Sequence, residues 1–394
     1  MKEGWEIKKL GDVCEVIAGQ SPKSQFYNED EIGLPFYQGK KEFQEKYIGE
    51  PTKWTSKITK EAVEDDILMS VRAPVGPVNF ATQKCCIGRG LAAIRSSKLI
   101  NKDYCFYYLQ SKEDELIGNS GAVFNSINKT QIGNIQIPIP PLTEQKQIVS
   151  ILDKACTAID QAKANIEKNI ENAKELFQSK LNDIFSQKGD GWEEKRFKEV
   201  CVLQRGFDLP KRLRKKGNYD LVTSSGVKDS HAEYKVEGPG VVTGRSGSIG
   251  NVFYIENNFW PLNTALYIKD FNGNDEKYVY YFLKNFDLSK YSTGTGVPTL
   301  NRNFVHDKNV LSTNNIDKQK EVVKTLDSLT VKVDEIQRFY NNKLNELEEL
   351  KKSILQKAFA GELTSPKGTK YRKEVRSASD SDNIITNQNP ERVK

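Results

Sequence analysis

The sequence predicts an α+β fold in which two repeated domains are joined by two long antiparallel coiled-coil helices with pseudo-twofold symmetry. A helical pattern of apolar residues begins directly after Ile137–Pro141, where three prolines prevent a strand-like run from continuing. The same pattern returns later, because Gln319–Asp327 repeats Gln145–Asp153 at an offset of 174 residues. The preceding segments repeat as well, since Gly191–Cys201 matches Gly4–Cys14 at an offset of 187 residues. We therefore expect the order domain, helix, domain, helix.

The first long helix is expected over about 142–188, with Thr143 as its N-cap and Gly189 just beyond its end. Its apolar residues are spaced mostly by threes and fours, which is typical of a coiled-coil seam. The predicted seam consists of Ile148, Leu152, Ala155, Ile159, Ala162, Ile166, Ile170, Ala173, Leu176 and Leu181.

The second long helix is expected over about 315–363, and its apolar residues match the first seam position by position. These residues are Val322, Leu326, Leu329, Val333, Ile336, Tyr340, Leu344, Leu347 and Leu350. Two helices with matching seams, far apart in one chain, are expected to pack on each other. At about 1.5 Å per residue, ~40 residues of such a helix span roughly 60 Å.

The repeat places the first domain at 1–141 and the second at 189–314, and leaves 364–394 as a polar, charged tail. We expect that tail to be disordered. Within the first domain the pattern predicts a strand at Leu91–Arg95 and a short helix at Tyr104–Leu109, which Tyr278–Leu283 repeats.

Composition limits the class of protein. The 394 residues are enough for two or three domains, and the net charge of +6 permits nucleic-acid binding without demonstrating it. Mean hydropathy is −0.62, and no apolar run approaches the ~18 residues of a membrane span. Six cysteines without Cys-x-x-Cys spacing and two histidines make a zinc site improbable. Because the first residues also lack a signal peptide pattern, we expect a cytoplasmic protein without membrane contact.

Motifs for catalysis are missing from the sequence. It contains neither the Gly-x-x-x-x-Gly-Lys-Ser/Thr loop of ATP-hydrolysing enzymes nor the Gly-x-Ser-x-Gly elbow of hydrolases. Gly244–Gly250 is rich in glycine, but a strand follows it as well as precedes it. We expect a tight hairpin with positive φ there rather than a nucleotide site.

The positive functional signal lies in loops that combine Arg and Lys with Asn, Gln, Ser and Thr. Such side chains neutralise phosphates and hydrogen-bond the edges of bases, so they are candidates for contact with double-stranded DNA. Arg72 and Arg245 carry the most weight because both copies keep an arginine in the same loop. The candidates of the first domain are Gln20, Lys23, Gln38, Lys40, Lys41, Arg72, Asn125 and Asn128. Those of the second are Arg205, Lys211, Arg212, Arg214, Lys215, Lys216, Ser224, Ser225, Lys228, Arg245, Thr299 and Asn301.

Three segments give the chain a resemblance to the specificity subunits of Type I restriction–modification systems. They are Gly4–Val13, the proline and Glu-Gln junction at Ile137–Val149, and Lys357–Thr364. The second junction, Val310–Lys320, departs from this pattern because it has no prolines.

The resemblance implies two target-recognition domains that each read half of a split, asymmetric DNA site. It also implies that the helices form a spacer on which two methyltransferase (modification) subunits dock, and that restriction subunits join the complex. S-adenosylmethionine, ATP and magnesium would belong to those partner subunits, and the chain itself would hold no cofactor or metal and would not be an enzyme. Two alternatives stay open: a methyltransferase with its own recognition domain, and a coiled-coil scaffold without a DNA role.

Overall fold

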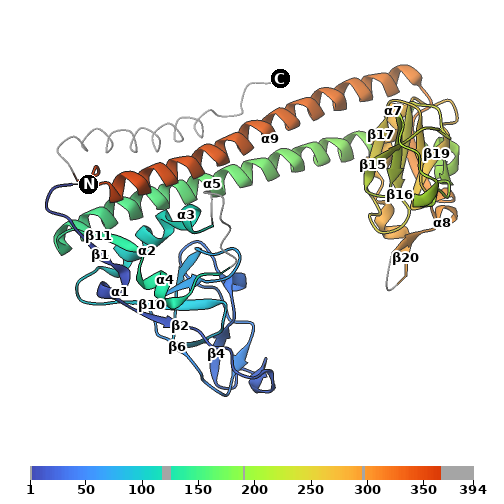
Figure 1. Cartoon of the computed structure of the whole chain (residues 1–394). Helices are drawn as coiled ribbons and strands as arrows, with labels where there is room; N and C mark the ends of the chain where they lie inside the picture. Colours follow the sequence, from blue (N-terminus) through green and yellow to red (C-terminus); the bar gives the residue numbers. More distant parts are fainter. Residues whose placement is uncertain (1, 118–125, 190, 295–297, 365–394) are drawn as a thin grey trace. The chain divides into compact units, whose positions relative to one another are not determined.

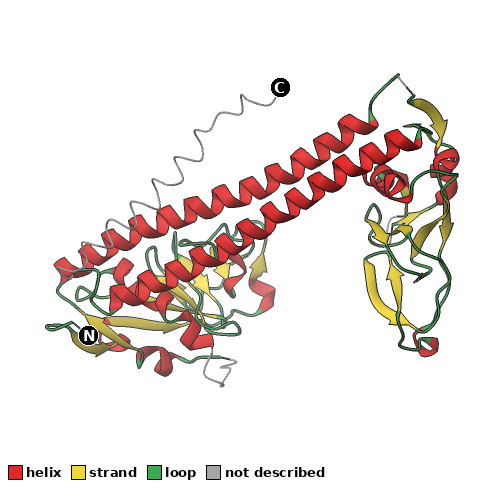
Figure 2. Ribbon diagram, turned by 90° about the horizontal axis from the view of Figure 1, so that it is seen from above, coloured by secondary structure: helices red, strands yellow, loops and turns green. Residues whose placement is uncertain are grey.

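The computed structural model describes residues 2–117, 126–189, 191–294 and 298–364. The chain forms two compact units, one from 1–165 together with 343–394 and the other from 166–342. Each unit combines sheets and short helices with parts of both long helices (Figures 1 and 2). We keep the names domain 1 for residues 2–141 and domain 2 for residues 191–314. Residues 365–394, for which the sequence predicts disorder, lie outside the described residues.

Domain 1 is built on a four-stranded antiparallel sheet in the order β2-β10-β7-β8, formed by Cys14–Ala18, Leu91–Ser96, Ile67–Ser70 and Val78–Phe80. A second sheet has the order β3-β5-β4-β9-β6, formed by Tyr27–Asn28, Trp54–Thr55, Leu34–Tyr37, Cys85–Ile87 and Glu61–Ala62. β1 (Glu6–Lys9) pairs with β11 (Gln136–Ile139). The helices are α1 (Leu10–Val13), α2 (Lys102–Ser111), α3 (Glu113–Ile117) and α4 (Lys129–Gly133).

Domain 2 repeats this plan with the sheet β13-β19-β16-β17, formed by Val202–Arg205, Ala265–Asp270, Gly240–Gly244 and Val252–Ile255. Its second sheet, β15-β14-β18, is formed by Gly226–His231, Tyr219–Thr223 and Phe259–Pro261. Two short pairs join β12 (Glu193–Arg196) to β22 (Asn309–Ser312) and β20 (Ser292–Thr293) to β21 (Thr299–Leu300). The helices are α6 (Phe197–Val200), α7 (Glu276–Asn285) and α8 (Arg302–His306).

The equivalent strand orders confirm the predicted α+β fold with an internal repeat. β10 and α2 include the strand and helix expected at Leu91–Arg95 and Tyr104–Leu109. The expected hairpin is present too, because β16 and β17 are antiparallel, and Gly247 and Gly250 between them have φ of +85° and +90°. Glycine adopts such positive φ without steric cost.

The long helices are α5 (Leu142–Phe185) and α9 (Ile316–Phe359), each of 44 residues. Within each unit they run antiparallel. In the first, Lys163 forms an ion pair with Glu348, and in the second the Asn169 amide donates a hydrogen bond to the Tyr340 hydroxyl at 3.2 Å. The predicted antiparallel pair is therefore confirmed. In the part of the chain described, no helix has the length and apolar character needed to cross a membrane.

Some positions of the predicted seam are wrong. Ile148, Leu152 and Leu326 are fully buried, but Leu176 is 62% exposed, and Ile336 and Leu350 are 39% and 42% exposed. A straight α-helix drifts by about 20° per heptad relative to a 3.5-residue repeat, so a regular seam rotates out of the contact. The domains cover apolar residues near the helix ends, while two helices alone bury only a narrow stripe.

The two helices begin in different ways. Thr143 is not the N-cap of α5, because it lies inside the helix and the Pro141 carbonyl accepts hydrogen bonds from the Glu144 and Gln145 amides. At α9 the Asn315 side chain takes this role, since its Oδ1 accepts from the Asp317 and Lys318 amides at 3.0 and 3.2 Å. A capping asparagine thus replaces the prolines that the second junction lacks.

A fully buried glutamine joins each domain to its long helix. Gln145 donates to the Pro140 carbonyl at 2.8 Å and accepts from the Asn101 amide at 2.8 Å. Gln319 donates to the Thr313 carbonyl at 2.6 Å and accepts from the Asp275 amide at 2.9 Å.

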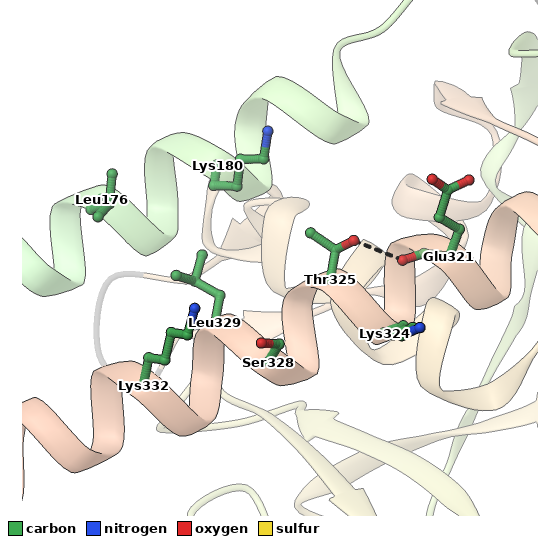
Figure 3. A pocket seen from close by; sticks show the side chains of 8 residues that line it. All are labelled: Leu176, Lys180, Glu321, Lys324, Thr325, Ser328, Leu329 and Lys332. Carbon is green, nitrogen blue, oxygen red and sulfur yellow. Dashed lines mark hydrogen bonds between the residues drawn. The ribbon is translucent and has the colours of Figure 1, made fainter. Parts of the chain in front are cut away.

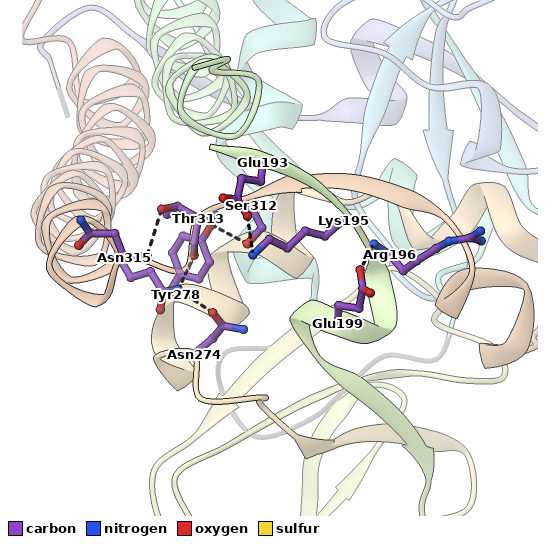
Figure 4. Close-up of polar contacts among 10 residues, drawn as sticks. Glu193, Lys195, Arg196, Glu199, Asn274, Tyr278, Ser312, Thr313 and Asn315 are labelled. Carbon is purple, nitrogen blue, oxygen red and sulfur yellow. Dashed lines mark hydrogen bonds and ion pairs between the residues drawn. The ribbon is translucent and has the colours of Figure 1, made fainter. Parts of the chain in front are cut away.

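The polar contacts around the second joint extend through the loop that precedes α9 (Figure 4). The Tyr278 and Ser312 hydroxyls lie 3.2 Å apart, and the Thr313 amide donates to the Tyr278 hydroxyl at 3.4 Å. In each domain, the hydrogen bonds of the buried glutamine thus fix the end of the four-stranded sheet that is closer to the long helix.

Replacing either glutamine should therefore loosen a joint. Gln145→Ala or Gln319→Ala is expected to lower the free energy of unfolding by about 2–3 kcal/mol, because each buried polar group left unpaired costs about 1–3 kcal/mol. Gln161 is exposed on α5, and its side-chain amide donates to Asn165. Gln161→Ala is therefore the matched control and should change stability by less than ~0.5 kcal/mol. Denaturant unfolding checks this, and equal losses for buried and exposed glutamines would contradict it.

Candidate nucleic-acid interface

The end of each four-stranded sheet that is remote from the buried glutamine carries a cluster of loops, which we call the loop edge. In domain 1 it consists of residues 19–21, 71–72 and 88–90, which follow β2, follow β7 and precede β10. In domain 2 the equivalent residues are 206–208, 245–246 and 262–264. The strand register supports the equivalence, because Ser70 pairs with Leu91 and Gly244 pairs with Ala265.

Both loop edges depend on a glycine at the same position. The Gly19 amide donates to the Leu91 carbonyl and the Gly206 amide to the Ala265 carbonyl, each at 3.0 Å. A Cβ added to Gly19 would lie 2.2 Å from the Gly88 carbonyl oxygen, and one added to Gly206 would lie 2.3 Å from the Leu262 carbonyl oxygen. The backbones therefore pass closer together than any side chain allows, which brings two loops of each loop edge into contact.

Arg72 and Arg245 lie in equivalent loops but one position apart, because the strand register makes Val71 the counterpart of Arg245 and Ser246 the counterpart of Arg72. The predicted correspondence of the two arginines is therefore wrong by one residue. The residue after the end of each central strand is held in the same way, because Val71 accepts from the Ile127 amide at 3.0 Å and Arg245 from the Leu300 amide at 2.8 Å. The side chain of Arg72 is exposed, whereas that of Arg245 is half-buried and donates to the Asn263 carbonyl at 2.9 Å.

Domain 2 surrounds Arg245 with a polar network that the sequence did not reveal. The Arg205 Nη2 donates to both carboxylate oxygens of Asp208, at 2.8 and 3.0 Å, and the Asn263 side-chain amide also donates to Asp208. The Asn263 amide, together with the Arg205 guanidinium, lowers the pKa of Asp208, so the carboxylate is anionic at neutral pH. Asp208 was missed because scattered carboxylates are usually solvated surface charges.

Domain 1 has Ser21 and Arg89 where domain 2 has Asp208 and Asn263. The Arg89 amide donates to the Ser21 hydroxyl at 3.1 Å, and the Arg89 side chain is exposed. The sequence signal that could have found this arginine is its place between Gly88 and Gly90, in a tight turn joining two strands. The two loop edges thus share the course of their backbone and an arginine in the same loop, but differ in the other polar groups.

The remaining candidates of domain 1 fall into two groups. Gln20 belongs to the loop edge and Gln38 lies beside it, and both side chains are exposed. The backbone amide of Gln20 donates to the Ile87 carbonyl, and the Gln38 carbonyl accepts from the Gly90 amide. Lys40 instead lines a separate hollow of about 310 Å³ beside Glu113. The exposed side chains of this domain include Lys23, Lys40 and Lys41. Asn125 lies outside the described residues.

Asn128 and Asn301 have a local structural use. Each is an N-cap whose side-chain oxygen accepts a helix amide, from Gln131 at 3.0 Å in α4 and from Asn303 at 3.1 Å in α8. Thr299 lies in the short strand β21. These three residues therefore help to shape the loops at which they lie.

The basic segment Lys211–Lys216 of domain 2 begins with a short 3-10 helix and is mostly exposed. Arg214 differs, because it is half-buried and its Nε donates to the Leu209 carbonyl at 3.3 Å. The exposed cations of the segment are Lys211, Arg212, Lys215 and Lys216.

The turn between β14 and β15 approaches the loop edge through serine. The Ser225 hydroxyl lies 3.1 Å from that of Ser248, in the hairpin that follows Arg245. Lys228 is exposed on β15, whereas Ser224 is buried.

A second surface feature lies on the long helices of the second unit. An open groove of about 610 Å³ is lined by Leu176 and Lys180 of α5 and by six residues of α9 (Figure 3). Leu176 and Leu329 make it apolar, and Lys324 and Lys332 join Lys180 as its cations. Among the described residues, no group of three or more His, Cys, Asp or Glu is placed to hold a metal ion.

Comparison with known proteins links this architecture to one family. The profile described as the Type I restriction modification DNA specificity domain matches residues 2–172 and 189–349, which is most of the chain and includes both repeats.

Curated relatives carry the same description. The chain is 44% identical over 184 residues to the type I restriction enzyme MjaX specificity subunit of Methanocaldococcus jannaschii, a match that covers 45% of this chain and 43% of the relative. Two further specificity subunits of that organism, MjaIX and MjaVIII, also match, and the chain spans about half the length of each of the three relatives. The EcoKI specificity subunit of Escherichia coli (strain K12) is 24% identical over 93% of this chain and 90% of its own length.

Solved structures share the fold. A chain from work on complex assembly and conformational transition of the type I R-M system gives a TM-score of 0.75 at 16% identity, covering 92% of this chain and 99% of that chain. The HsdS subunit from Thermoanaerobacter tengcongensis gives 0.51 at 17% identity, covering 92% and 98%.

Proposed function

Because the chain belongs to the Type I restriction modification DNA specificity domain family, we propose that it is the DNA-recognition subunit of a Type I restriction–modification complex. The observation that carries this proposal is the pair of loop edges, one in each repeat, with an arginine in the loop that follows the equivalent strands β7 and β16. Each domain would read one half of a split site. Arginine suits this task because its planar fork can make bidentate hydrogen bonds to a guanine in the major groove.

We expect the site to be asymmetric. The first loop edge carries Ser21, Arg72 and Arg89, whereas the second carries Arg245 and the Arg205–Asp208 pair. Different donors and acceptors select different bases, so the two half-sites should differ in sequence. The exposed lysines and arginines of Lys211–Lys216 would neutralise phosphates beside one half-site only.

We assign the chemistry to partner subunits. Two methyltransferase subunits would dock on the long helices. The groove at Leu176 and Leu329 is the surface we propose for one of them, because it combines the exposed Leu176 and the half-buried Leu329 with three lysines and one glutamate. Restriction subunits would join this assembly. S-adenosylmethionine, ATP and magnesium would bind the partners, since this sequence contains no phosphate-binding loop for ATP.

Substitution of Arg72 and Arg245 tests the proposal. In the complete complex with its methyltransferase, Arg72→Ala should weaken selection of bases in one half-site and Arg245→Ala in the other, each by about 1–3 kcal/mol. Sequencing of DNA captured from a random library measures both halves at once. Loss of phosphate contacts would instead lower affinity for all sequences and flatten the salt dependence.

Arg338→Ala is the matched control, because Arg338 is an exposed arginine on α9. It should leave both half-sites unchanged. Captured DNA that keeps the same motif in all three variants would reject the loop edges as the reading surface.

A further inference from the structure

We propose that Arg205 reads a guanine in the half-site of domain 2 and that Asp208 is the positioning residue for its guanidinium. This inference rests on the proposed function and assigns a base class to one part of the loop edge. This assignment does not follow from Arg72 and Arg245, because domain 1 has no carboxylate equivalent to Asp208 and carries Ser21 there.

The geometry leaves the reading atoms of Arg205 available. Both Asp208 oxygens contact the same nitrogen, Nη2, at 2.8 and 3.0 Å. Among the contacts of the described residues, Nη1 and Nε of Arg205 have no protein partner. A guanidinium held by one nitrogen keeps a second pair of donors for the O6 and N7 acceptors of guanine.

Two segments that are distant in sequence converge on the carboxylate, which distinguishes it from an ordinary surface ion pair. Arg205 ends β13, Asp208 follows it by three residues, and Asn263 reaches Asp208 from the loop between β18 and β19. The Asn263 carbonyl also accepts from Arg245, so the network fixes both arginines of this loop edge. A rotamer fixed before binding loses less entropy when it contacts a base.

The charge distribution favours a base over a phosphate as the ligand of Arg205. Asp208 is an exposed anion beside the guanidinium, and it would repel a DNA phosphate placed against Arg205. The nearby cations of Lys211–Lys216 supply phosphate contacts without this penalty. A carboxylate at such a surface is useful where it orients an arginine toward a base edge.

Methylation of duplexes by the complete complex tests the inference. The wild-type motif is determined first, and each base pair of the half-site assigned to domain 2 is then substituted in turn. Arg205→Lys keeps the charge and removes the fork, so discrimination at one G·C pair should fall by roughly 10- to 100-fold. Arg196→Lys, an exposed arginine at the other end of domain 2, should leave the profile unchanged.

Asp208→Ala adds a readout that general loss of structure would not produce. It should relax discrimination at the same base pair while raising affinity for random DNA, because an anion has been removed from the interface. The double variant Arg205→Lys/Asp208→Ala should discriminate no less than Arg205→Lys alone, since Asp208 acts through Arg205.

The outcomes separate the two levels of the proposal. A wild-type complex without any sequence motif would reject the proposed function and this inference with it. A normal motif that Arg205→Lys leaves intact, or a uniform loss of affinity for all DNA, would overturn the guanine assignment and leave the proposed function standing. Relaxation at different positions by Arg205→Lys and Asp208→Ala would overturn the positioning role.

Discussion

Leu326→Asp is expected to unfold the second unit, lowering its free energy of unfolding by more than about 4 kcal/mol. Leu326 is fully buried in the hydrophobic core that also contains Leu181 and Tyr281. A carboxylate at this position would lie among hydrophobic side chains and must either lose its charge or expose the core. Native domains are stable by only about 5–15 kcal/mol, so this loss removes most of the margin.

Leu176→Asp is the matched control, because Leu176 and Leu326 both belong to the predicted coiled-coil seams. Leu176 is 62% exposed, so its replacement should change the free energy of unfolding by no more than about 0.5 kcal/mol. The methyltransferase docking proposed for the groove would still suffer, because a carboxylate would replace an apolar contact. Circular dichroism and denaturant titration measure stability, and partner titration measures docking. Equal destabilisation by both variants would contradict the burial described for the helix pair.

Lengthening both long helices by four residues should move the DNA specificity rather than abolish it. We choose insertions after Asn165 in α5 and after Leu344 in α9, because Lys163 and Glu348 pair near these points. Four residues add about 6 Å and close to one helical turn, and the rise of DNA is about 3.4 Å per base pair. The unread gap should therefore lengthen by about 1–2 bp, while both half-sites stay unchanged.

The original site should lose at least ~10³-fold in relative affinity, because only one half-site can then be engaged, and specific binding usually exceeds non-specific binding by that factor or more. Insertion of four residues after Asn165 alone is the control and should break the register of the helix pair. An enlarged complex that keeps the old gap would show that the helices do not set the half-site spacing.

The repeat and the long helices could be predicted from sequence because their signals are periodic or duplicated. The Gln145 and Gln319 segments repeat over nine residues, and the structure explains why, since both glutamines are buried at equivalent joints. The motif around Trp5 has a similar cause, because its indole nitrogen donates to Glu144 at 3.2 Å. The Trp5 motif and the start of α5, which are distant in sequence, are thus joined by this hydrogen bond.

The exposure of seam residues could not be predicted, because it depends on where a domain covers the helices. Leu176 and Leu181 fit the same spacing, yet only Leu181 is buried. The loop edge was only partly predictable for a similar reason. Arg72 and Arg245 were found by comparing the two copies, whereas Asp208 and Asn263 acquire their role only when two distant loops meet.

The central claim is that one chain reads two different half-sites through its two repeats. Methylation sequencing of genomic DNA from cells that carry this chain and its methyltransferase tests it most directly. The expected result is one asymmetric motif in two parts, with half-site centres about one turn of DNA apart, roughly 10 bp, and unread base pairs between them. A continuous motif, two identical half-sites, or methylation without sequence preference would contradict it.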